Sequence, residues 1–310
     1  MYSKEQPKKT YIDNLKEKGY VIIPNVLTDL EIEQYKKLFF EWFHKNEENL
    51  KNIHKTSYPH GIFKGHQVGH QLFAWLIRIN PKVQGIFKEI WKTDKLVVSF
   101  DGCCYIPKDC EKKDNCWTHT DQGPSLRGLQ CYQGYVALTS NKERTFRVYE
   151  ESHLLHEKYF SDKTDEECKG NWHKIDNEYL KEIKESKKVL DVPSGSLVLW
   201  DSRCFHQNQF GKPKSEERLV QYVCFLPASH PKNTEAMMRK REKYFNELRT
   251  TSHWPCPIKV NGLQVRNYGD KSKIIKYENL TSPELKDIKE EALKIINPFK
   301  YKQLEPEPEI

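Results

Sequence analysis

The amino-acid sequence predicts a mainly β protein with flanking helices (α+β) and a double-stranded β-helix, or jelly roll, as its core. Between residues 95 and 230, most segments are short and rich in β-branched and aromatic residues, which is typical of strands. They do not alternate regularly with helices, so antiparallel sheets are favoured over a parallel sheet. We expect one domain over residues 1–310: a helical support and lid (1–94), the jelly-roll core (95–230) with a helical insert (153–186), and a C-terminal helical extension (231–310).

Composition narrows the class of protein. At 310 residues the chain can bury a substantial core, and 12% aromatic residues argue against disorder. The net charge of +7 is spread along the chain and is interpreted first as a solvated surface. No apolar run approaches the roughly 18 residues of a membrane span, and the N-terminus lacks the apolar core of a signal peptide. Nine cysteines without such a signal indicate reduced thiols and a cytoplasmic protein.

The first 94 residues are expected to contribute helices and one strand. Residues 10–18 have the pattern of a short amphipathic helix, and residues 19–24 that of a strand ended by proline. Thr28 and Glu31 form a capping box that predicts a helix to about Lys45. An apolar face on this helix is expected to pack on a sheet: Leu30, Ile32, Tyr35, Leu38, Phe39 and Trp42. Two further helices are expected at about residues 71–79 and 81–91.

Residues 46–71 are interpreted as an irregular lid, because glycines and histidines are dense there. The histidines are His54, His60, His66 and His70. His66 and His70 lie four residues apart, as metal ligands on one helix face would. A histidine cluster that touches substrate, or simply a polar loop, is the favoured interpretation.

The expected strands of the core are residues 95–107, 116–121, 129–139, 144–149, 187–192, 196–200 and 217–226. The insert between residues 153 and 186 is charged and has helical character. Residues 231–249 predict a helix whose run of charges from Met237 to Arg249 is interpreted as a solvated face. Ser282 and Pro283 are expected to cap a last helix that ends near Ile296.

His119 and Asp121 are the first candidate functional pair. In a strand, side chains two residues apart point to the same face, so an imidazole and a carboxylate would project together. They would supply two of the three ligands of the two-histidine, one-carboxylate site that holds non-haem iron(II) and leaves positions open. The alternative is a surface strand with a Thr-Asp turn.

His206 and Arg218 are candidates for the remaining parts of such a site. His206 follows an apolar strand that a jelly roll would bring beside His119; a satisfied core histidine is the alternative. Arg218 opens another strand, and a buried guanidinium is costly unless it meets a carboxylate, such as the far end of a dicarboxylate. A surface salt bridge with Glu216 or Glu217 is the alternative.

Two other groups of residues are candidates for sites. The cysteines Cys103, Cys104, Cys110 and Cys116 do not have the spacing of paired zinc knuckles, so a zinc site is disfavoured. Arg203 is interpreted as a structural partner of Asp201 rather than as a residue that binds an anionic substrate.

Taken in order, these motifs resemble the iron(II)/2-oxoglutarate-dependent oxygenases, and most closely the phytanoyl-CoA dioxygenase-like family. His119-Thr120-Asp121, His206 and Arg218 match that pattern, and residues 19–27, Gly-Tyr-Val-Ile-Ile-Pro-Asn-Val-Leu, fit the family's opening strand. The resemblance spans roughly residues 10–230. Residues 150–153, Glu-Glu-Ser-His, stand where the family has a Pro-Gly-Ser-His-like turn, and Tyr135 stands at the place of a central-strand tryptophan.

The resemblance implies iron(II) held by His119, Asp121 and His206, with 2-oxoglutarate and O2 as co-substrates. It implies that Arg218 pairs with the C5 carboxylate of 2-oxoglutarate; Tyr135 and Asn208 are candidates for further contacts. Ser99 and Asp101 are candidates for lining the pocket. Since iron binding needs neutral imidazoles and an ionised carboxylate, it should weaken at acid pH.

The favoured function is a dioxygenase that hydroxylates a small-molecule or lipid-like substrate, acting as a monomer or homodimer without a membrane partner. Halogenation is disfavoured because Asp121 supplies a carboxylate. One alternative is an oxygenase that modifies nucleic acid or protein. The net charge permits it, but no stripe of basic and aromatic residues favours it. A second alternative is a non-catalytic jelly-roll protein that binds a ligand or partner.

Overall fold

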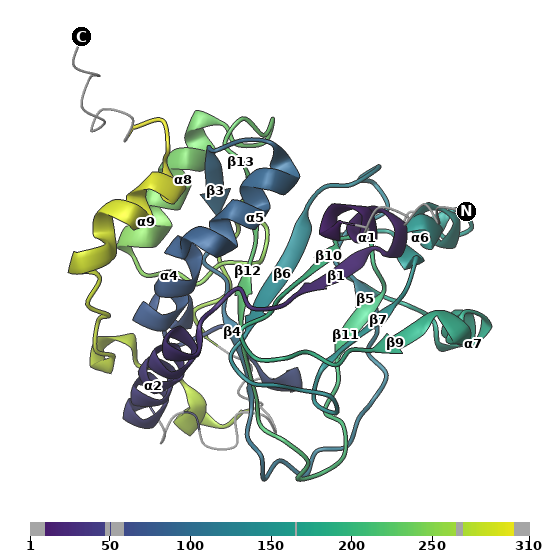
Figure 1. The fold of residues 1–310 in the computed structure, drawn as a ribbon, viewed down its shortest axis with the longest axis horizontal. Helices are drawn as coiled ribbons and strands as arrows, with labels where there is room; N and C mark the ends of the chain where they lie inside the picture. The colour runs from purple at the N-terminus through teal and green to yellow at the C-terminus, as the bar shows by residue number, and fades with distance from the viewer. Residues whose placement is uncertain (1–9, 47–49, 51–58, 165, 265–268, 301–310) are drawn as a thin grey trace, which may run out of the picture.

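Two antiparallel sheets face each other in the computed structural model, which describes residues 10–46, 50, 59–164, 166–264 and 269–300 (Figure 1). The six-stranded sheet has the order β1 (Tyr20–Ile23), β10 (Leu197–Asp201), β6 (Tyr132–Ala137), β12 (Arg218–Val223), β4 (Cys103–Ile106) and β2 (Ile62–Phe63). The five-stranded sheet has the order β8 (His173–Lys174), β5 (His119–Thr120), β11 (His206–Asn208), β7 (Phe146–Tyr149) and β9 (Lys187–Val189). A short third sheet pairs β13 (Phe225–Pro227) with β3 (Leu96–Val98). The predicted jelly roll is confirmed.

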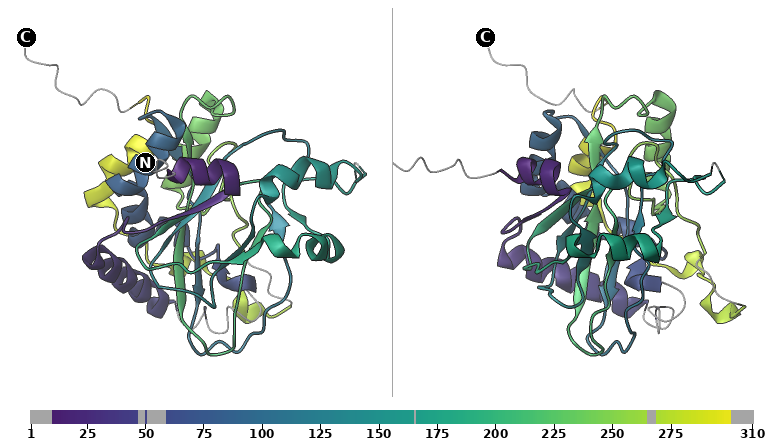
Figure 2. Two further views of the ribbon diagram at one scale, coloured as in Figure 1. Left: turned by 45° about the vertical axis from the view of Figure 1, so that its right-hand side comes forward. Right: turned by 90° about the vertical axis from the view of Figure 1, so that its right-hand side faces the viewer.

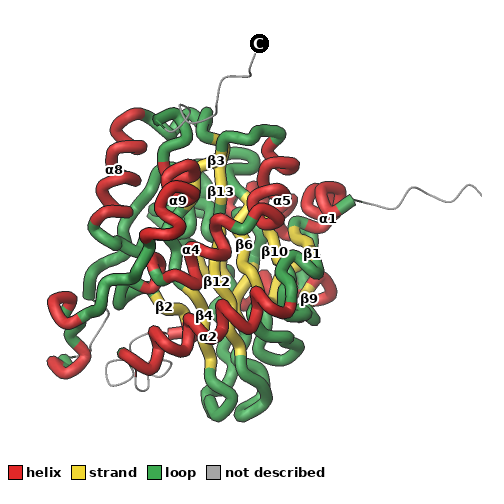
Figure 3. Tube along the Cα trace, turned by 60° about the vertical axis from the view of Figure 1, so that its left-hand side comes forward, coloured by secondary structure: helices red, strands yellow, loops and turns green. Residues whose placement is uncertain are grey.

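Helices cover the outer face of the six-stranded sheet, so that this sheet lies between them and the five-stranded sheet (Figures 1 and 3). They are α2 (Asp29–Lys45), α4 (Leu72–Ile79), α5 (Pro81–Trp91), α8 (Glu235–Asn246) and α9 (Lys289–Ile296). The short helix α1 (Tyr11–Lys18) precedes β1. Helices α6 (Ser152–Phe160) and α7 (Asn177–Glu182) come from the insert and extend on the opposite side (Figure 2). No helix within the described ranges has both the length and the apolar character needed to span a membrane.

Both faces of the six-stranded sheet are buried, and successive side chains alternate between two cores. On β6, Val136 packs with the helices, whereas Tyr135 and Ala137 pack between the sheets. On β4, Cys103 and Cys104 alternate in the same way. The space between the two sheets is therefore the interior into which the site residues project.

Helix α2 begins as predicted, but its buried apolar face includes fewer residues than expected. The capping box is present, since Thr28 Oγ1 accepts from the Glu31 backbone N–H at 3.3 Å and Glu31 Oε2 accepts from the Thr28 N–H at 2.7 Å. Phe39 lies 5.1 Å from the ring of Tyr105 on β4 and 5.4 Å from that of Phe73 on α4. Leu30 is 84% exposed, so its assignment to the apolar face was wrong. It stands in the first turn, which precedes the part of the helix that packs on its neighbours.

Two expected strands are each divided. Residues 95–107 form β3 and β4, and residues 217–226 form β12 and β13, with the members of each pair in different sheets. The chain bends at Gly102, where a Cβ atom would lie 1.8 Å from the carbonyl oxygen of Phe63. Only glycine fits so close an approach of two backbones.

The C-terminal region differs from its prediction in two places. The last helix begins at Lys289 after the turn Lys286–Ile288, not at Ser282 and Pro283, because burial of Ile288 and Ala292 sets where the chain docks. On α8, Arg241 is fully buried and donates to the carbonyl oxygens of Pro255 and Ile296. That part of the charge run is thus a packing contact and not a solvated face.

The predicted histidine lid is also only partly correct. His54 lies outside the described residues. His66 and His70 are buried, so neither is a lid residue nor part of an exposed loop. His70 lies between the rings of Trp75 and Phe100, with its Nε2 at 3.1 Å from the carbonyl oxygen of Arg249. Tertiary packing against the helices has turned these polar residues inward.

The burial of His70 predicts a loss of stability in mild acid. Burial, and then the nearby charge of Arg78, lower the pKa of His70 from 6.5 to about 3. Below pH 6.5 the unfolded chain therefore binds a proton at His70 that the folded chain does not bind. The contribution of this residue to the free energy of unfolding is fully present above that pH and decreases as the pH falls. At pH 5 the loss amounts to about 2 kcal/mol from this residue.

Urea unfolding at pH 7 and pH 5 checks this expectation. His70→Gln keeps a donor for the Arg249 carbonyl but does not titrate, so its unfolding free energy should fall less between the two pH values. The exposed His44→Gln is the matched control and should behave as the wild type does. An equal pH dependence in His70→Gln and wild type would contradict the assignment.

Candidate metal centre

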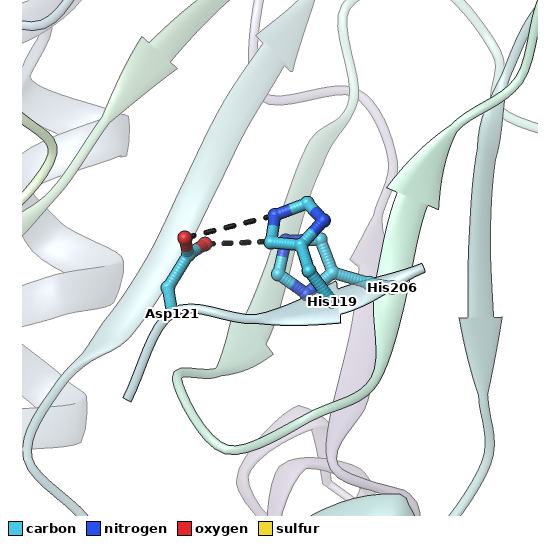
Figure 4. Close-up of side chains that lie close together, drawn as sticks. All are labelled: His119, Asp121 and His206. Carbon is cyan, nitrogen blue, oxygen red and sulfur yellow. Dashed lines mark ion pairs between the residues drawn. The ribbon is translucent and has the colours of Figure 1, made fainter. Parts of the chain in front are cut away.

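His119, Asp121 and His206 come together at the ends of two neighbouring strands of the five-stranded sheet (Figure 4). Strand β11 pairs antiparallel with β5, and the register places His206 directly opposite His119. Asp121 follows β5 by one residue, so its side chain projects to the same side as that of His119. The sequence pattern and the strand register together account for the cluster.

The side chains have the separations of ligands around one ion. Asp121 Oδ1 lies 3.6 Å from His119 Nε2, and Asp121 Oδ2 lies 3.3 Å from His206 Nε2. Adjacent ligand atoms at about 2.1 Å from an octahedral ion would be about 3 Å apart. All three residues are 5–7% exposed. In the part of the chain that the structure describes, this is the one group of histidine, cysteine or acidic side chains with metal-binding geometry.

Hydrogen bonds to backbone carbonyls orient both imidazoles so that Nε2 faces Asp121. His119 Nδ1 lies 3.2 Å from the carbonyl oxygen of Trp117, and His206 Nδ1 lies 3.0 Å from that of Cys204. A carbonyl can only accept, so each Nδ1 carries the proton and donates it. The lone pair of each ring then lies on Nε2, which faces Asp121. This is the outer-shell arrangement that orients histidine ligands in metal sites.

The electrostatics of the cluster also suit a cation. Burial lowers the pKa of His119, and the neighbouring His206 lowers it further. Burial alone would raise the pKa of Asp121, but attraction to His253 is the largest of the effects that hold it well below its usual value. His119 is therefore neutral and Asp121 ionised at neutral pH. Two imidazole nitrogens with one carboxylate on one face are the donor set of non-haem iron(II) sites with open positions.

A pocket of about 400 Å³ opens from the cluster between the two sheets. Its lining comes from both sheets, the insert, the segment around β2 and the C-terminal extension: Ile62, Lys64, Asp101, Trp117, Gln133, Gly134, Phe146, Asn171, Trp172, Trp200, Asn208, Tyr222, Ser252, His253, Trp254, Pro257 and Lys259. Its volume is in the range of sites for small molecules. The cluster thus stands at the wall of a partly open cavity that is lined by both aromatic and polar side chains.

Arg218, the predicted anchor, is completely buried beside this pocket. It donates from Nη1 to the carbonyl oxygen of Arg144 and from Nη2 to Asn208 Oδ1, both at 3.1 Å. Its guanidinium carbon lies 5.1 Å from the centre of the Tyr135 ring. Among the described residues no carboxylate forms an ion pair with it, and its Nε–H has no hydrogen-bond partner. The alternative of a surface salt bridge with Glu216 or Glu217 does not hold.

Asn208 connects the anchor to the cluster. It lies two residues after His206 on β11, and its Nδ2 donates to the hydroxyl oxygen of Tyr222 at 2.7 Å. Two residues of a strand span about 6.7 Å. A short dicarboxylate that reaches the cluster at one end could therefore reach Arg218 at the other. Asn208 and Tyr222 line the pocket at this point, whereas Arg218 is not part of the lining and contacts it through its hydrogen bond to Asn208.

Of the other residues that were predicted near the site, some lie where expected and others do not. Asp101 lines the pocket, whereas Ser99 is buried away from it. Arg203 pairs with Asp201 at 2.8 Å, as the structural interpretation expected. Cys103 and Cys104 lie in different cores, which is incompatible with a shared zinc ion.

The turn at residues 150–153 keeps a left-handed geometry despite its lack of glycine. Glu151 has a φ of 64°, a conformation that glycine adopts at lower cost. Ser152 Oγ accepts from the backbone N–H of Phe205 at 2.8 Å, just before His206. The turn at residues 150–153 therefore supports the start of β11 through this hydrogen bond, although its sequence departs from the Pro-Gly-Ser-His-like pattern.

Sequence reasoning missed most of the pocket, including His253, Trp254, Trp172 and Gln133. His253 Nε2 lies 3.8 Å from Asp121 Oδ1, although 132 positions separate the two in the chain numbering. A signal was present, because residues 252–257 read Ser-His-Trp-Pro-Cys-Pro, an unusual cluster in a polar extension. Trp172 and Gln133 carry no local signal of their own.

The chain is similar to a family model, to a curated protein and to several solved structures. The family model described as phytanoyl-CoA dioxygenase (PhyH) matches residues 15–209, more than half of the chain. "Ava biosynthesis cluster protein O" of Aspergillus versicolor is 26% identical over 264 residues, covering 78% of this chain and 85% of that protein. Among solved structures, the epimerase SnoN in complex with Fe3+, alpha ketoglutarate and nogalamycin RO has a TM-score of 0.49 at 17% identity, covering 71% of this chain and 83% of that one. EctD from S. alaskensis in its apoform has a TM-score of 0.48 at 13% identity, covering 74% and 80%.

Proposed function

Because this chain belongs to the phytanoyl-CoA dioxygenase family, we propose that it hydroxylates a small-molecule or lipid-like substrate as an iron(II)- and 2-oxoglutarate-dependent dioxygenase. The family is one of iron(II)/2-oxoglutarate oxygenases, so iron(II) is the cofactor and 2-oxoglutarate and O2 are the co-substrates. When bound, iron(II) supplies the activation of oxygen that is coupled to oxidative decarboxylation of 2-oxoglutarate. One observation carries the proposal: both Nε2 atoms and the Asp121 carboxylate converge at a pocket wall.

In this proposal, His119 and His206 bind iron through Nε2 and Asp121 binds it through a carboxylate oxygen. The carbonyls that accept from the two Nδ1–H groups hold the rings in this orientation without help from the metal. Because the three ligand atoms come from one wall of the pocket, they would hold an ion there and leave positions free toward the pocket. The chain's part is to fix the ligands and to keep positions free for co-substrate and oxygen.

Arg218 binds the C5 carboxylate of 2-oxoglutarate, with Asn208 and Tyr135 beside it. The Nε–H of the buried guanidinium has no hydrogen-bond partner among the described residues, and Nη2 donates to the neutral Asn208 amide. An amide oxygen is a weaker acceptor for a cation than a carboxylate oxygen. We infer that the carboxylate shares or replaces that contact. The Tyr135 ring packs against the guanidinium and limits its movement.

The pocket receives the substrate next to the ligands and restricts water there. Its aromatic lining suits an apolar substrate body, and its volume of about 400 Å³ suits a small molecule more than a segment of nucleic acid. We also propose that the chain acts as one oxygenase domain. Ser252 and Lys259 of the C-terminal extension line the same pocket as residues of the jelly roll.

An anaerobic spectrum followed by exposure to oxygen tests the proposal. Iron(II) and 2-oxoglutarate added together should produce a weak visible charge-transfer band that neither produces alone. Oxygen should then give slow formation of succinate and carbon dioxide even without substrate. Zinc(II) in place of iron(II) is the control and should give neither. If iron(II) and 2-oxoglutarate fail to bind, the protein is a non-catalytic binding module instead.

A further inference from the structure

We propose that Gln133 determines substrate specificity by binding a carboxamide or lactam group of the substrate. The proposal rests on the proposed function, since it places this group beside the iron ligands. Gln133 lies on β6 of the six-stranded sheet, opposite Trp200 of β10, and lines the pocket. It belongs to none of the motifs of the metal centre or of the Arg218 anchor.

The Gln133 side chain is buried and has no hydrogen-bond partner among the residues that the structure describes. It is 2% exposed, and neither its Oε1 nor its Nε2 has a hydrogen bond within the described part of the chain. Buried amides of this kind are nearly always paired, and each unpaired group costs about 1–3 kcal/mol. Residues on a well-packed strand that carry such a cost are commonly those that bind a ligand.

Two indole N–H groups of the same pocket share this feature. Trp200 and Trp254 line the cavity, are 4% and 5% exposed, and have no hydrogen-bond partner for Nε1 among the described residues. Three residues of the pocket wall therefore contribute unpaired donors, Gln133 Nε2 and the two indole N–H groups, but only one unpaired acceptor, Gln133 Oε1, among the described residues.

An amide is the group that complements this set. Its carbonyl oxygen accepts two hydrogen bonds and its N–H donates one, so Gln133 can bind it in a paired, two-point contact. A carboxylate would leave Gln133 Oε1 facing negative charge, in a pocket that already contains the buried Asp101. A ketone or an ester would leave the same oxygen without a donor.

The position relative to the metal centre is suitable for recognition. The Trp200 ring lies 5.2 Å from the His206 ring, so a group held between Trp200 and Gln133 is close to the iron ligands. Across the pocket, the Trp172 ring lies 5.3 Å from that of His119 and is 52% exposed. An exposed tryptophan on a pocket wall indicates that a flat, apolar substrate body covers it.

A set of near-isosteric probes tests the assignment. Isoindolin-1-one carries a lactam, phthalide replaces its N–H by oxygen, and 1-indanone replaces it by a methylene group; 2-methylbenzoate supplies the anion. Their dissociation constants are measured by calorimetry on the protein loaded with iron(II) and 2-oxoglutarate under nitrogen. We expect wild type to bind the lactam about 10-fold more tightly than phthalide or 1-indanone. Gln133→Met should abolish that preference, and Gln130→Met, three residues earlier and outside the pocket lining, should retain it.

The charge-transfer band separates the possible failures. If no band forms, the proposed function fails before any probe is added. If the band forms but wild type binds the lactam and phthalide equally, Gln133 does not recognise an amide. If wild type binds 2-methylbenzoate more tightly than the lactam, the pocket instead binds an anion, which Lys64 and Lys259 would hold. A weaker affinity of Gln133→Met for 2-oxoglutarate would assign Gln133 to the co-substrate. The latter three results overturn the inference.

Discussion

Replacing Asp121 with alanine is expected to abolish iron(II) binding at the centre and to lower 2-oxoglutarate turnover by more than about 100-fold. In many metal sites, loss of an outer-shell partner alone lowers metal affinity or activity by about 10- to 100-fold. Asp121 is a proposed ligand, so its loss should have a larger effect. It also supplies the one negative charge between two imidazoles, at 3.3 Å and 3.6 Å from their Nε2 atoms. Without it, a divalent cation would meet only neutral donors.

Iron retained after gel filtration and succinate formed per enzyme are the two measurements. Asp121→Asn keeps the shape of the side chain without its charge, so it should also lose most of the iron. Asp191→Ala, whose side chain is 61% exposed, is the matched control and should keep both signals. Circular dichroism verifies that each variant is folded. Iron content equal to wild type in Asp121→Ala would rule out this carboxylate as a ligand.

Replacing Arg218 with leucine is expected to weaken 2-oxoglutarate binding by about 100-fold or more while iron(II) binding remains. The guanidinium is the buried positive charge beside Asn208, and truncation of one partner of a buried charge pair has effects of this size. Arg218→Lys keeps a positive charge but loses the planar guanidinium, so its affinity for 2-oxoglutarate should lie between those of Arg218→Leu and wild type. Titration of the charge-transfer band with 2-oxoglutarate measures each affinity.

A second oxo-acid separates the role of Arg218 in binding from a role in folding. In 2-oxopentanoate a methyl group replaces the C5 carboxylate, so it retains the chelating end alone. Wild type should prefer 2-oxoglutarate by about the same 100-fold, and Arg218→Leu should bind the two acids almost equally. If the variant still discriminates between them, another residue holds the C5 carboxylate. A general loss of structure would weaken the binding of both acids to a similar extent.

Much of the secondary structure could be predicted from the sequence because its causes are local. The Thr28–Glu31 capping box, the proline-ended β1 and the two-residue spacing of His119 and Asp121 depend on neighbours within a few positions. The jelly-roll class followed from the absence of βαβ alternation. The order of motifs from residue 19 to Arg218 already indicated the family to which the chain belongs.

The errors arose where burial depends on segments far apart in the chain. Arg241 and His70 were taken for exposed residues because composition says nothing about the backbone carbonyls that receive their N–H groups. The start of α9 was misplaced because the docking of Ile288 outweighs a favourable cap at Ser282. In each case a tertiary contact decided the outcome against a local preference.

The sequence by itself determined the positions of most strands, the start of α2 and the pair of candidate ligands His119 and Asp121, since each is encoded by periodicity or spacing within a short window. Only the tertiary structure decided which side chains share the pocket. It brings His253 of the extension beside Asp121 and Trp254 into the pocket wall, and it leaves the buried Gln133 amide without a hydrogen-bond partner in the described part of the chain. The physical reason is that a cavity is bounded by segments that become neighbours only when the two sheets close on each other.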